Sequence, residues 1–148
     1  MYVSDSHVKR NPHALVLAYI DACYCNSNEA ALRDIFTRDV KKTDDTDKKR
    51  EPVKGIEQVL EVYRKLIAEN REDTDVIKTK IKIKENSASL RLNVQKLNSS
   101  TQTCSISKIK LQFYCKDEDK MLKIYKIVTS FDLIVKTPID PVSDDELL

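Results

Sequence analysis

Two segments near the start of the chain carry apolar residues at every third or fourth position. From Pro12 to Cys25 these residues form one stripe, and the proline lies in the first turn. Polar residues 26–28 interrupt the stripe, and Ser27 or Asn28 can cap a second short helix. The apolar face of this second helix consists of Ala31, Leu32, Ile35 and Phe36.

A charged stretch separates these helices from a third one. Residues 41–52 contain no large apolar side chain, so they are expected to form a solvated loop or a weak edge strand. Apolar residues at helical spacing then predict a helix from Ile56 to about Asn70, after Gly55.

From Asp75 onward the apolar period changes from about 3.6 to 2, which is typical of half-buried strands. Four strands are predicted, and polar turns indicate that they follow one another as antiparallel neighbours. The predicted ranges are 75–84, 88–95, 108–115 and 122–135. The last strand is apolar on both faces, with Tyr125, Ile127, Phe131 and Leu133 on one and Ile124, Val128 and Ile134 on the other.

Helices followed by strands predict an α+β fold with the helices packed on one face of an antiparallel sheet. The helix pairs Tyr19-Ile20 and Ala31-Leu32, the break at 26–28, and Gly55 before the third helix resemble the nuclear transport factor 2-like (SnoaL-like) superfamily. This resemblance implies a cone, in which three N-terminal helices pack against a strongly curved, mainly antiparallel sheet. We expect a domain of this type over 12–136, an N-terminal arm over 1–11 and, from its composition, an acidic flexible tail over 137–148.

Composition narrows the chemistry. The 26 basic and 24 acidic residues give a net charge of +2, and there are one glycine, two histidines and no tryptophan. These counts disfavour Gly-rich phosphate loops and His-rich metal sites. No apolar leader or membrane-spanning run is evident, so we expect an intracellular protein of the nucleus or cytoplasm, without membrane contact, metal or cofactor. The four cysteines are expected to be reduced structural thiols.

The expected interior of the cone is aliphatic, which predicts no catalytic residue and no enzymatic activity. Asp132 is the one carboxylate within an apolar strand, and with Tyr19 or Tyr63 it forms the alternative: a pocket for an isomerase, a dehydratase or a ligand-binding protein. In the simpler interpretation Asp132 lies on the outer face and both tyrosines are core residues.

A row of lysines is the most unusual feature of the sequence. Side chains two apart share a strand face, so the lysines of the first strand line up and residues of neighbouring strands extend the row. The predicted partner-binding set is Lys78, Lys80, Lys82, Arg91, Lys108, Lys110, Tyr114 and Val128. An acidic protein surface or RNA phosphates would suit it, although lysines also keep an exposed sheet soluble. Few exposed aromatic residues are available to stack on bases, which makes RNA the weaker option.

These observations favour a non-enzymatic protein-interaction module that dimerises through its sheet. The resemblance implies nucleocytoplasmic transport or mRNA export as a role. Two lysine rows facing each other would repel, so a heterodimer with an acidic partner is favoured over a homodimer.

Overall fold

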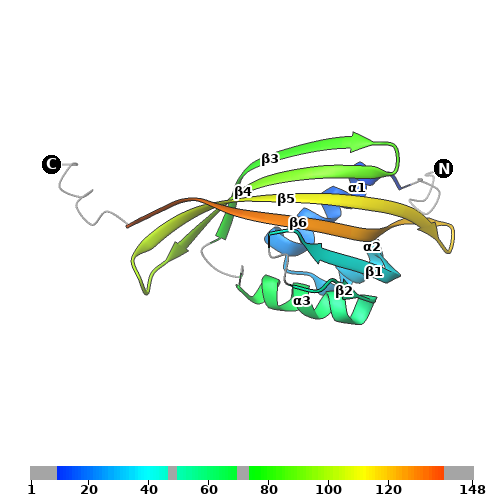
Figure 1. Cartoon of the computed structure of the whole chain (residues 1–148), viewed down its shortest axis with the longest axis horizontal. Helices are drawn as coiled ribbons and strands as arrows, with labels where there is room; N and C mark the ends of the chain where they lie inside the picture. Colours follow the sequence, from blue (N-terminus) through cyan, green and yellow to red (C-terminus); the bar gives the residue numbers. More distant parts are fainter. Residues whose placement is uncertain (1–9, 47–49, 70–73, 139–148) are drawn as a thin grey trace, which may run out of the picture.

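Six strands form one curved sheet that holds the helices against its inner face (Figure 1). The structure is a computed structural model, and it describes residues 10–46, 50–69 and 74–138. The helices are α1 (Pro12–Ile20), the π-helical turn η2 (Asp21–Cys25), α2 (Glu29–Ile35) and α3 (Ile56–Glu69). The strands are β1 (Phe36–Asp44), β2 (Val53–Lys54), β3 (Thr74–Lys84), β4 (Ser87–Asn98), β5 (Thr103–Glu118) and β6 (Met121–Pro138). The predicted α+β cone is confirmed.

The first helices begin where side chains satisfy their free backbone N–H groups. The Asn11 side chain accepts a hydrogen bond from the Ala14 N–H (2.8 Å), and that of Asn28 accepts one from Ala31 (3.2 Å). The predicted helix over 12–25 is continuous in space, but its last five residues widen into the π-helical turn.

Strand β1 corrects the prediction for the charged stretch. Residues 41–44 belong to this strand, which lies between β2 and β6 and runs parallel to β6. The second half of β1 lacks large apolar side chains because it borders an open cavity rather than the packed core. Phe36, predicted in the second helix, is already the first residue of the strand. Gly55, with φ of 90°, turns the chain from β2 into α3, and its N–H donates to the Val40 carbonyl (2.8 Å).

The four later strands are confirmed as an antiparallel series in the order of the sequence, and β-bulges change which face some residues occupy. The register of β6 shifts beside Tyr125, so that Ile124 and Ile127 are both fully buried. The prediction that placed these two isoleucines on opposite faces is therefore wrong. Tyr125 instead lies beside Tyr114, with ring centroids 6.4 Å apart.

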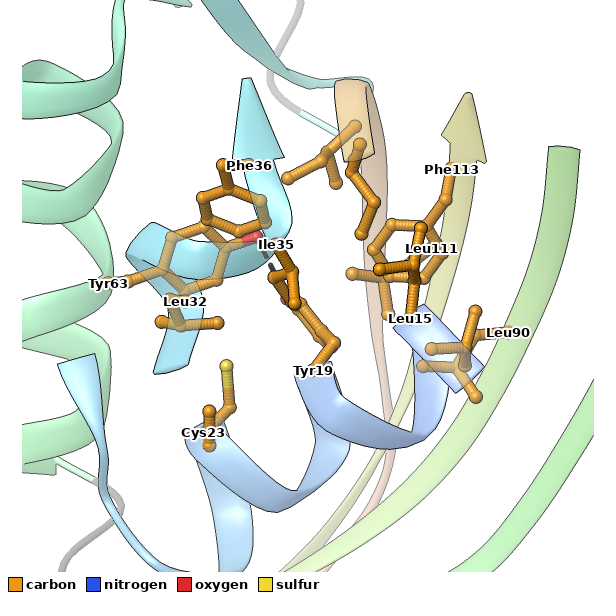
Figure 2. Packing of buried hydrophobic residues seen from close by; sticks show 14 of the residues in the cluster. Leu15, Tyr19, Cys23, Leu32, Ile35, Phe36, Tyr63, Leu90, Leu111 and Phe113 are labelled. Carbon is orange, nitrogen blue, oxygen red and sulfur yellow. Dashed lines mark hydrogen bonds between the residues drawn. The ribbon is translucent and has the colours of Figure 1, made fainter. Parts of the chain in front are cut away.

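The main core lies between the helices and the inner face of the sheet (Figure 2). Three aromatic rings meet at its centre. The Tyr19 ring lies 4.9 Å from Phe113 and 5.5 Å from Tyr63, centroid to centroid, in edge-on geometry. Aliphatic side chains from all three helices and from β4 to β6 close around them.

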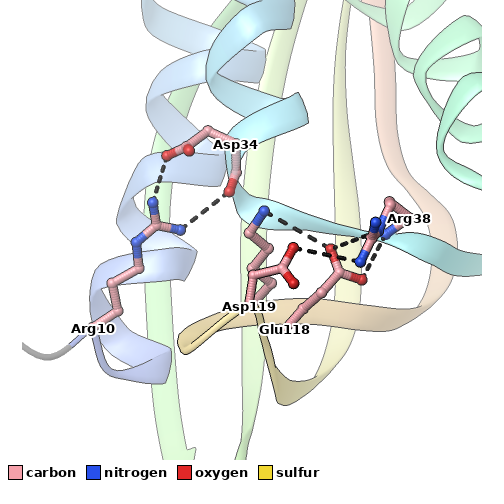
Figure 3. Close-up of polar contacts among 6 residues, drawn as sticks. Arg10, Asp34, Arg38, Glu118 and Asp119 are labelled. Atoms are coloured by element: carbon pink, nitrogen blue, oxygen red, sulfur yellow. Dashed lines mark hydrogen bonds and ion pairs between the residues drawn. The ribbon is translucent and has the colours of Figure 1, made fainter.

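Ion pairs connect residues that are far apart in the sequence near the start of α1 and the β5–β6 turn (Figure 3). Arg10 pairs with Asp34 of α2 (2.6 Å), while Arg38 of β1 reaches Glu118 and Asp119 at the β5–β6 turn (3.6 and 3.4 Å). Most of these side chains are solvent-exposed, so each pair contributes at most about 1 kcal/mol. The pairs made by Arg38 help to fix β1 beside the β5–β6 hairpin, while the Arg10–Asp34 pair joins the start of the described chain to α2.

Two further predictions depend on the ends of the chain. Most of the predicted N-terminal arm, with His7, lies outside the described residues, as does the predicted tail apart from residues 137–138, which end β6. None of the helices in the described ranges has both the length and the apolar character needed to cross a bilayer.

Candidate functional site

A cavity of about 600 Å³ opens between α3, β1 and the inner face of the sheet. Its deep part is aromatic and aliphatic, and charged side chains stand around its mouth. The lining residues used below are Tyr19, Tyr24, Lys42, Asp44, Arg50, Tyr63, Leu66, Glu69, Ile109, Leu111, Thr129 and Phe131. A hollow of this size matches those that hold small organic ligands.

Two tyrosines that line this cavity are joined through their hydroxyl groups (Figure 2). The Tyr19 hydroxyl donates a hydrogen bond to the Tyr63 hydroxyl (2.8 Å), and both side chains are almost completely buried. Burial raises the pKa of both hydroxyls well above the ordinary value, so both stay protonated at neutral pH. Because Tyr63 accepts from Tyr19, its own proton is directed elsewhere, and the bond it accepts makes it a stronger donor.

Two further polar groups face the cavity from β1 and β6. The Lys42 nitrogen lies 5.9 Å from the centre of the Tyr63 ring. Burial lowers the pKa of the Lys42 amine, and the nearby Asp44 carboxylate opposes this effect. The Thr129 hydroxyl is buried without a hydrogen-bond partner among the described residues. A buried hydroxyl without a partner on a cavity wall is a group that a ligand can satisfy.

Asp44 provides a carboxylate at the cavity wall. One of its oxygens accepts a hydrogen bond from the Thr46 N–H (3.0 Å), and the other lies 3.7 Å from an Arg50 nitrogen. Alternation along β1 places Asp44 on the same strand face as Lys42, and both line the cavity. The site thus combines a carboxylate, an amine and a hydroxyl donor around an apolar hollow.

The structure brings together Tyr19 and Tyr63 of the alternative pocket, but not Asp132. That residue is exposed on the outer face, opposite Lys108 of β5, as the simpler interpretation has it. Sequence reasoning missed Lys42 and Asp44. Alternation along the strand could have indicated them, because Lys42 and Asp44 follow the buried Val40 at steps of two residues and so share its strand face.

The predicted partner-binding residues all lie on the outer sheet face, where directly paired residues point the same way. Lys80, Arg91 and Lys110 form one row across three strands. On one side of this row, Lys78 and Lys108 are both paired with Asn93. On the other side, cross-strand pairs form a second row, which consists of Lys82, Ser89, Gln112 and Val128. Tyr114 lies farther along β5, and the centre of its ring is 5.3 Å from the Lys126 nitrogen. A shallow hollow of about 210 Å³ lies among Arg91, Lys110 and Val128.

The cysteines do not add to the site. All four cysteines are free thiols. Burial raises the pKa of the Cys115 thiol to about 11, and it also raises the pKa of the Cys23 thiol well above the ordinary value. Among the residues that the structure describes, no group of three or more His, Cys, Asp or Glu side chains could hold a metal ion.

Comparisons with known proteins identify the fold through structure alone. No protein-family model matches the chain, and no curated protein matches its sequence. Solved structures do match it. A "putative SnoaL-like polyketide cyclase" from Jannaschia sp. CCS1 aligns with a TM-score of 0.66 at 12% identity, over 88% of this chain and 92% of that one. A nuclear transport factor 2-like protein from Anabaena variabilis ATCC 29413 gives 0.64 at 12% identity, over 89% and 93%. A "putative ketosteroid isomerase" from Parabacteroides distasonis ATCC 8503 gives 0.55 at 17% identity, over 83% and 89%.

At these identities the likeness establishes the nuclear transport factor 2-like fold, as the resemblance implied. The enzyme names of two neighbours contradict the prediction that the chain has no enzymatic activity. That prediction assumed an inert aliphatic cone, whereas the cavity carries tyrosine, lysine and carboxylate groups. The three names give no support to the predicted role in nuclear transport.

Proposed function

We propose that this protein is a small-molecule enzyme that moves a proton beside the carbonyl group of an apolar substrate held in the cone cavity. The Tyr19–Tyr63 hydrogen bond carries the proposal, because it joins two protonated hydroxyl groups of residues that line the cavity. Solved structures named for isomerase and cyclase chemistry on the same fold support it.

Each polar group has a role in this reaction. The Tyr63 hydroxyl donates a hydrogen bond to the carbonyl oxygen and stabilises the enolate that forms. The Asp44 carboxylate removes the proton from the adjacent carbon and returns it to another carbon of the conjugated system, which gives an isomerised product. Lys42 adds positive charge near the developing enolate, and Thr129 positions the substrate through its otherwise unpartnered hydroxyl.

Isomerisation of a β,γ-unsaturated ketosteroid tests this function directly. The conjugated product absorbs in the ultraviolet, so the rate is read as an increase in absorbance. We expect Asp44→Asn to lower the rate by ~10²-fold or more and Tyr63→Phe by ~10- to 10³-fold, the usual range for a lost base or oxyanion donor. Asp132→Asn and Tyr114→Phe on the outer face are matched controls and should retain full activity.

Two results would contradict the proposal. One is a rate with the unchanged protein that does not exceed that of buffer for this ketone and for shorter β,γ-unsaturated ketones. The other is equal loss of activity in Asp44→Asn and its control Asp132→Asn, since this would separate the activity from the cavity.

We also propose that the outer sheet face binds an acidic segment of a partner protein. The row Lys80, Arg91 and Lys110 supports this, since the ion pairs found among the described residues involve none of these three. Charge complementarity favours an acidic partner, while a second copy would bring lysines against lysines.

Binding of a fluorescent oligoglutamate peptide at low and high salt tests this surface. We expect salt-sensitive binding that Lys80→Glu with Arg91→Glu abolishes, while Lys54→Glu on β2 leaves it unchanged. Tighter binding of an oligouridine than of the peptide would assign the face to RNA, and a homodimer broken by the double variant would assign it to self-association. Either outcome contradicts the acidic-partner proposal.

A further inference from the structure

The cavity continues beyond the helices along the inner face of the sheet. A second hollow, of about 430 Å³, shares Tyr24, Leu66, Glu69, Ile109 and Phe131 with the first. Five shared lining residues make the two hollows one trough. The ends of β4, β5 and β6, which extend past the helices at the left of Figure 1, form the outer part of its floor.

Strand register divides the floor of this trough into cross-strand rows. From the cavity outward, the β5–β6 pairs are Leu111 with Thr129, Ile109 with Phe131, Ser107 with Leu133, and Ser105 with Lys136. Successive rows are two residues apart on β5, or about 6.6 Å at ~3.3 Å per residue. Three steps therefore separate the first row from the last by about 20 Å.

The middle of the floor is apolar and uncovered. Phe131 and Leu133 expose 47% and 53% of their surface, although both point to the inner face that is elsewhere packed against helices. Adjacent large apolar side chains in an open hollow favour an apolar ligand.

The outer end of the trough is cationic. Lys96 of β4 and Lys136 of β6 flank Ser105 in a single row, and all three line the second hollow. Glu69 is the acidic side chain that lines the same hollow, and it comes from the end of α3 rather than from the floor. Two lysines and a serine hydroxyl in one row suit a carboxylate.

We propose that the substrate is a long-chain keto acid, with its carbonyl group in the cavity and its carboxylate at the Lys96–Lys136 row. The position of the carbonyl rests on the proposed function, whereas the chain and the carboxylate are placed by the trough alone. With C–C bonds of ~1.5 Å, an extended chain advances ~1.3 Å per carbon, so 20 Å corresponds to about 15 carbons.

A chain-length series of saturated fatty acids tests the trough without any reaction. Binding of acids with 8 to 16 carbons, kept below their micelle-forming concentrations, is measured by calorimetry together with that of the methyl ester of each acid. We expect affinity to rise about 2- to 4-fold per methylene until the trough is filled, as for methylenes leaving water. The acids should bind more tightly than their esters.

Variants of the trough separate its two parts. Lys96→Met with Lys136→Met should weaken binding of the 16-carbon acid about 10-fold or more, the usual effect of losing a charge-assisted hydrogen bond, and leave its ester unchanged. Leu133→Ser should flatten the dependence on chain length. Ile134→Ser is the matched control, because Ile134 is an equally exposed residue of the same strand that lines neither hollow.

Affinity independent of chain length, or equal binding of acid and ester, would overturn the proposal. So would a concentration-dependent dimer lost in Leu133→Ser, since a second copy would then cover the apolar floor. These failures are distinct from failure of the proposed function: Asp44→Asn should lower turnover by ~10²-fold or more yet leave the chain-length series intact. If the acids bind as expected and no ketone is converted, the placement of the chain and its carboxylate in the trough stands, while the enzymatic proposal and the placement of the carbonyl group fail.

Discussion

The two ends of the inner sheet face share a backbone pattern but differ in what covers them. Beneath the helices, Phe113 is fully buried against Tyr19, whereas toward the strand ends Phe131 is 47% exposed. Both phenylalanines lie on neighbouring strands and face inward. The covered end stabilises the fold, and the open end leaves apolar surface for a ligand. Exposure therefore separates residues that maintain the cone from residues available to bind in it.

Substituting each of these phenylalanines by alanine gives the largest expected contrast. Phe113→Ala should lower the free energy of unfolding by about 3–5 kcal/mol, because it leaves a cavity among rings that cannot collapse. Phe131→Ala should cost at most about 1 kcal/mol, since half of its surface is already in water. Urea unfolding followed by circular dichroism measures both, and equal losses would contradict the division of the inner face.

Alkaline pH should act selectively on the covered end. The Tyr19 and Tyr63 hydroxyls have raised pKa values in the folded protein, so the unfolded chain loses these protons first as pH rises above ~10. The contribution of these tyrosines to the free energy of unfolding should be fully present below pH 10. It should fall above pH 10, by about 1.4 kcal/mol per buried tyrosine at pH 11. The double variant Tyr19→Phe with Tyr63→Phe should lose less between pH 8 and 11 in urea titrations. A loss as large as that of the unchanged protein would contradict this cause.

Removing one hydroxyl of the pair at neutral pH should have a smaller effect. In Tyr63→Phe the buried Tyr19 hydroxyl loses its acceptor, which should cost about 1–2 kcal/mol of unfolding free energy. Tyr114→Phe on the outer face should change stability by less than about 0.5 kcal/mol. Comparison by thermal unfolding suffices, and equal effects would indicate that the hydrogen bond contributes no stability.

Lys42 lies between the two ends and should give the smallest change. Burial lowers the pKa of the Lys42 amine in the folded state, so the charged amine destabilises the fold. This destabilisation is complete below the folded-state pKa and declines as pH rises toward ~10.4, the pKa of an unperturbed lysine. Lys42→Met should therefore be more stable than the unchanged protein at pH 7, by no more than about 1 kcal/mol, with an advantage that shrinks by pH 10. Lys54→Met provides the exposed control in the same urea titrations. An advantage that grows with pH would contradict the assigned cause.

Sequence alone predicted the elements that carry a clear apolar period. Ile81 and Ile83 alternate with lysines, and their strand was placed correctly, as was the helix that begins at Ile56. The bulge at Tyr125 escaped prediction because apolar residues occupy both faces of this strand, among them Ile124, Ile127 and Val128, so a shift of one residue leaves no break in the pattern.

The candidate site was harder to predict than the fold. Tyr19 and Tyr63 were predicted as residues of the alternative pocket, but the carboxylate predicted with them was Asp132, because it lies within an apolar strand, and Asp44 was missed. Asp44 belongs to a strand whose outer half is charged, and that strand owes its place to pairing with β6 rather than to its own composition. Such pairing is a long-range property, which local periodicity does not contain.

The parallel pairing of β1 with β6 determines when this site can exist during synthesis. Asp44 pairs with Thr129, more than 80 residues later in the chain, and both line the cavity. In a nascent chain on the ribosome, Lys42 and Asp44 therefore lack the cavity wall that β6 provides until β6 has emerged. A polypeptide interrupted before residue 121 would contain all the helices and strands β1 to β5, and still no complete binding chamber.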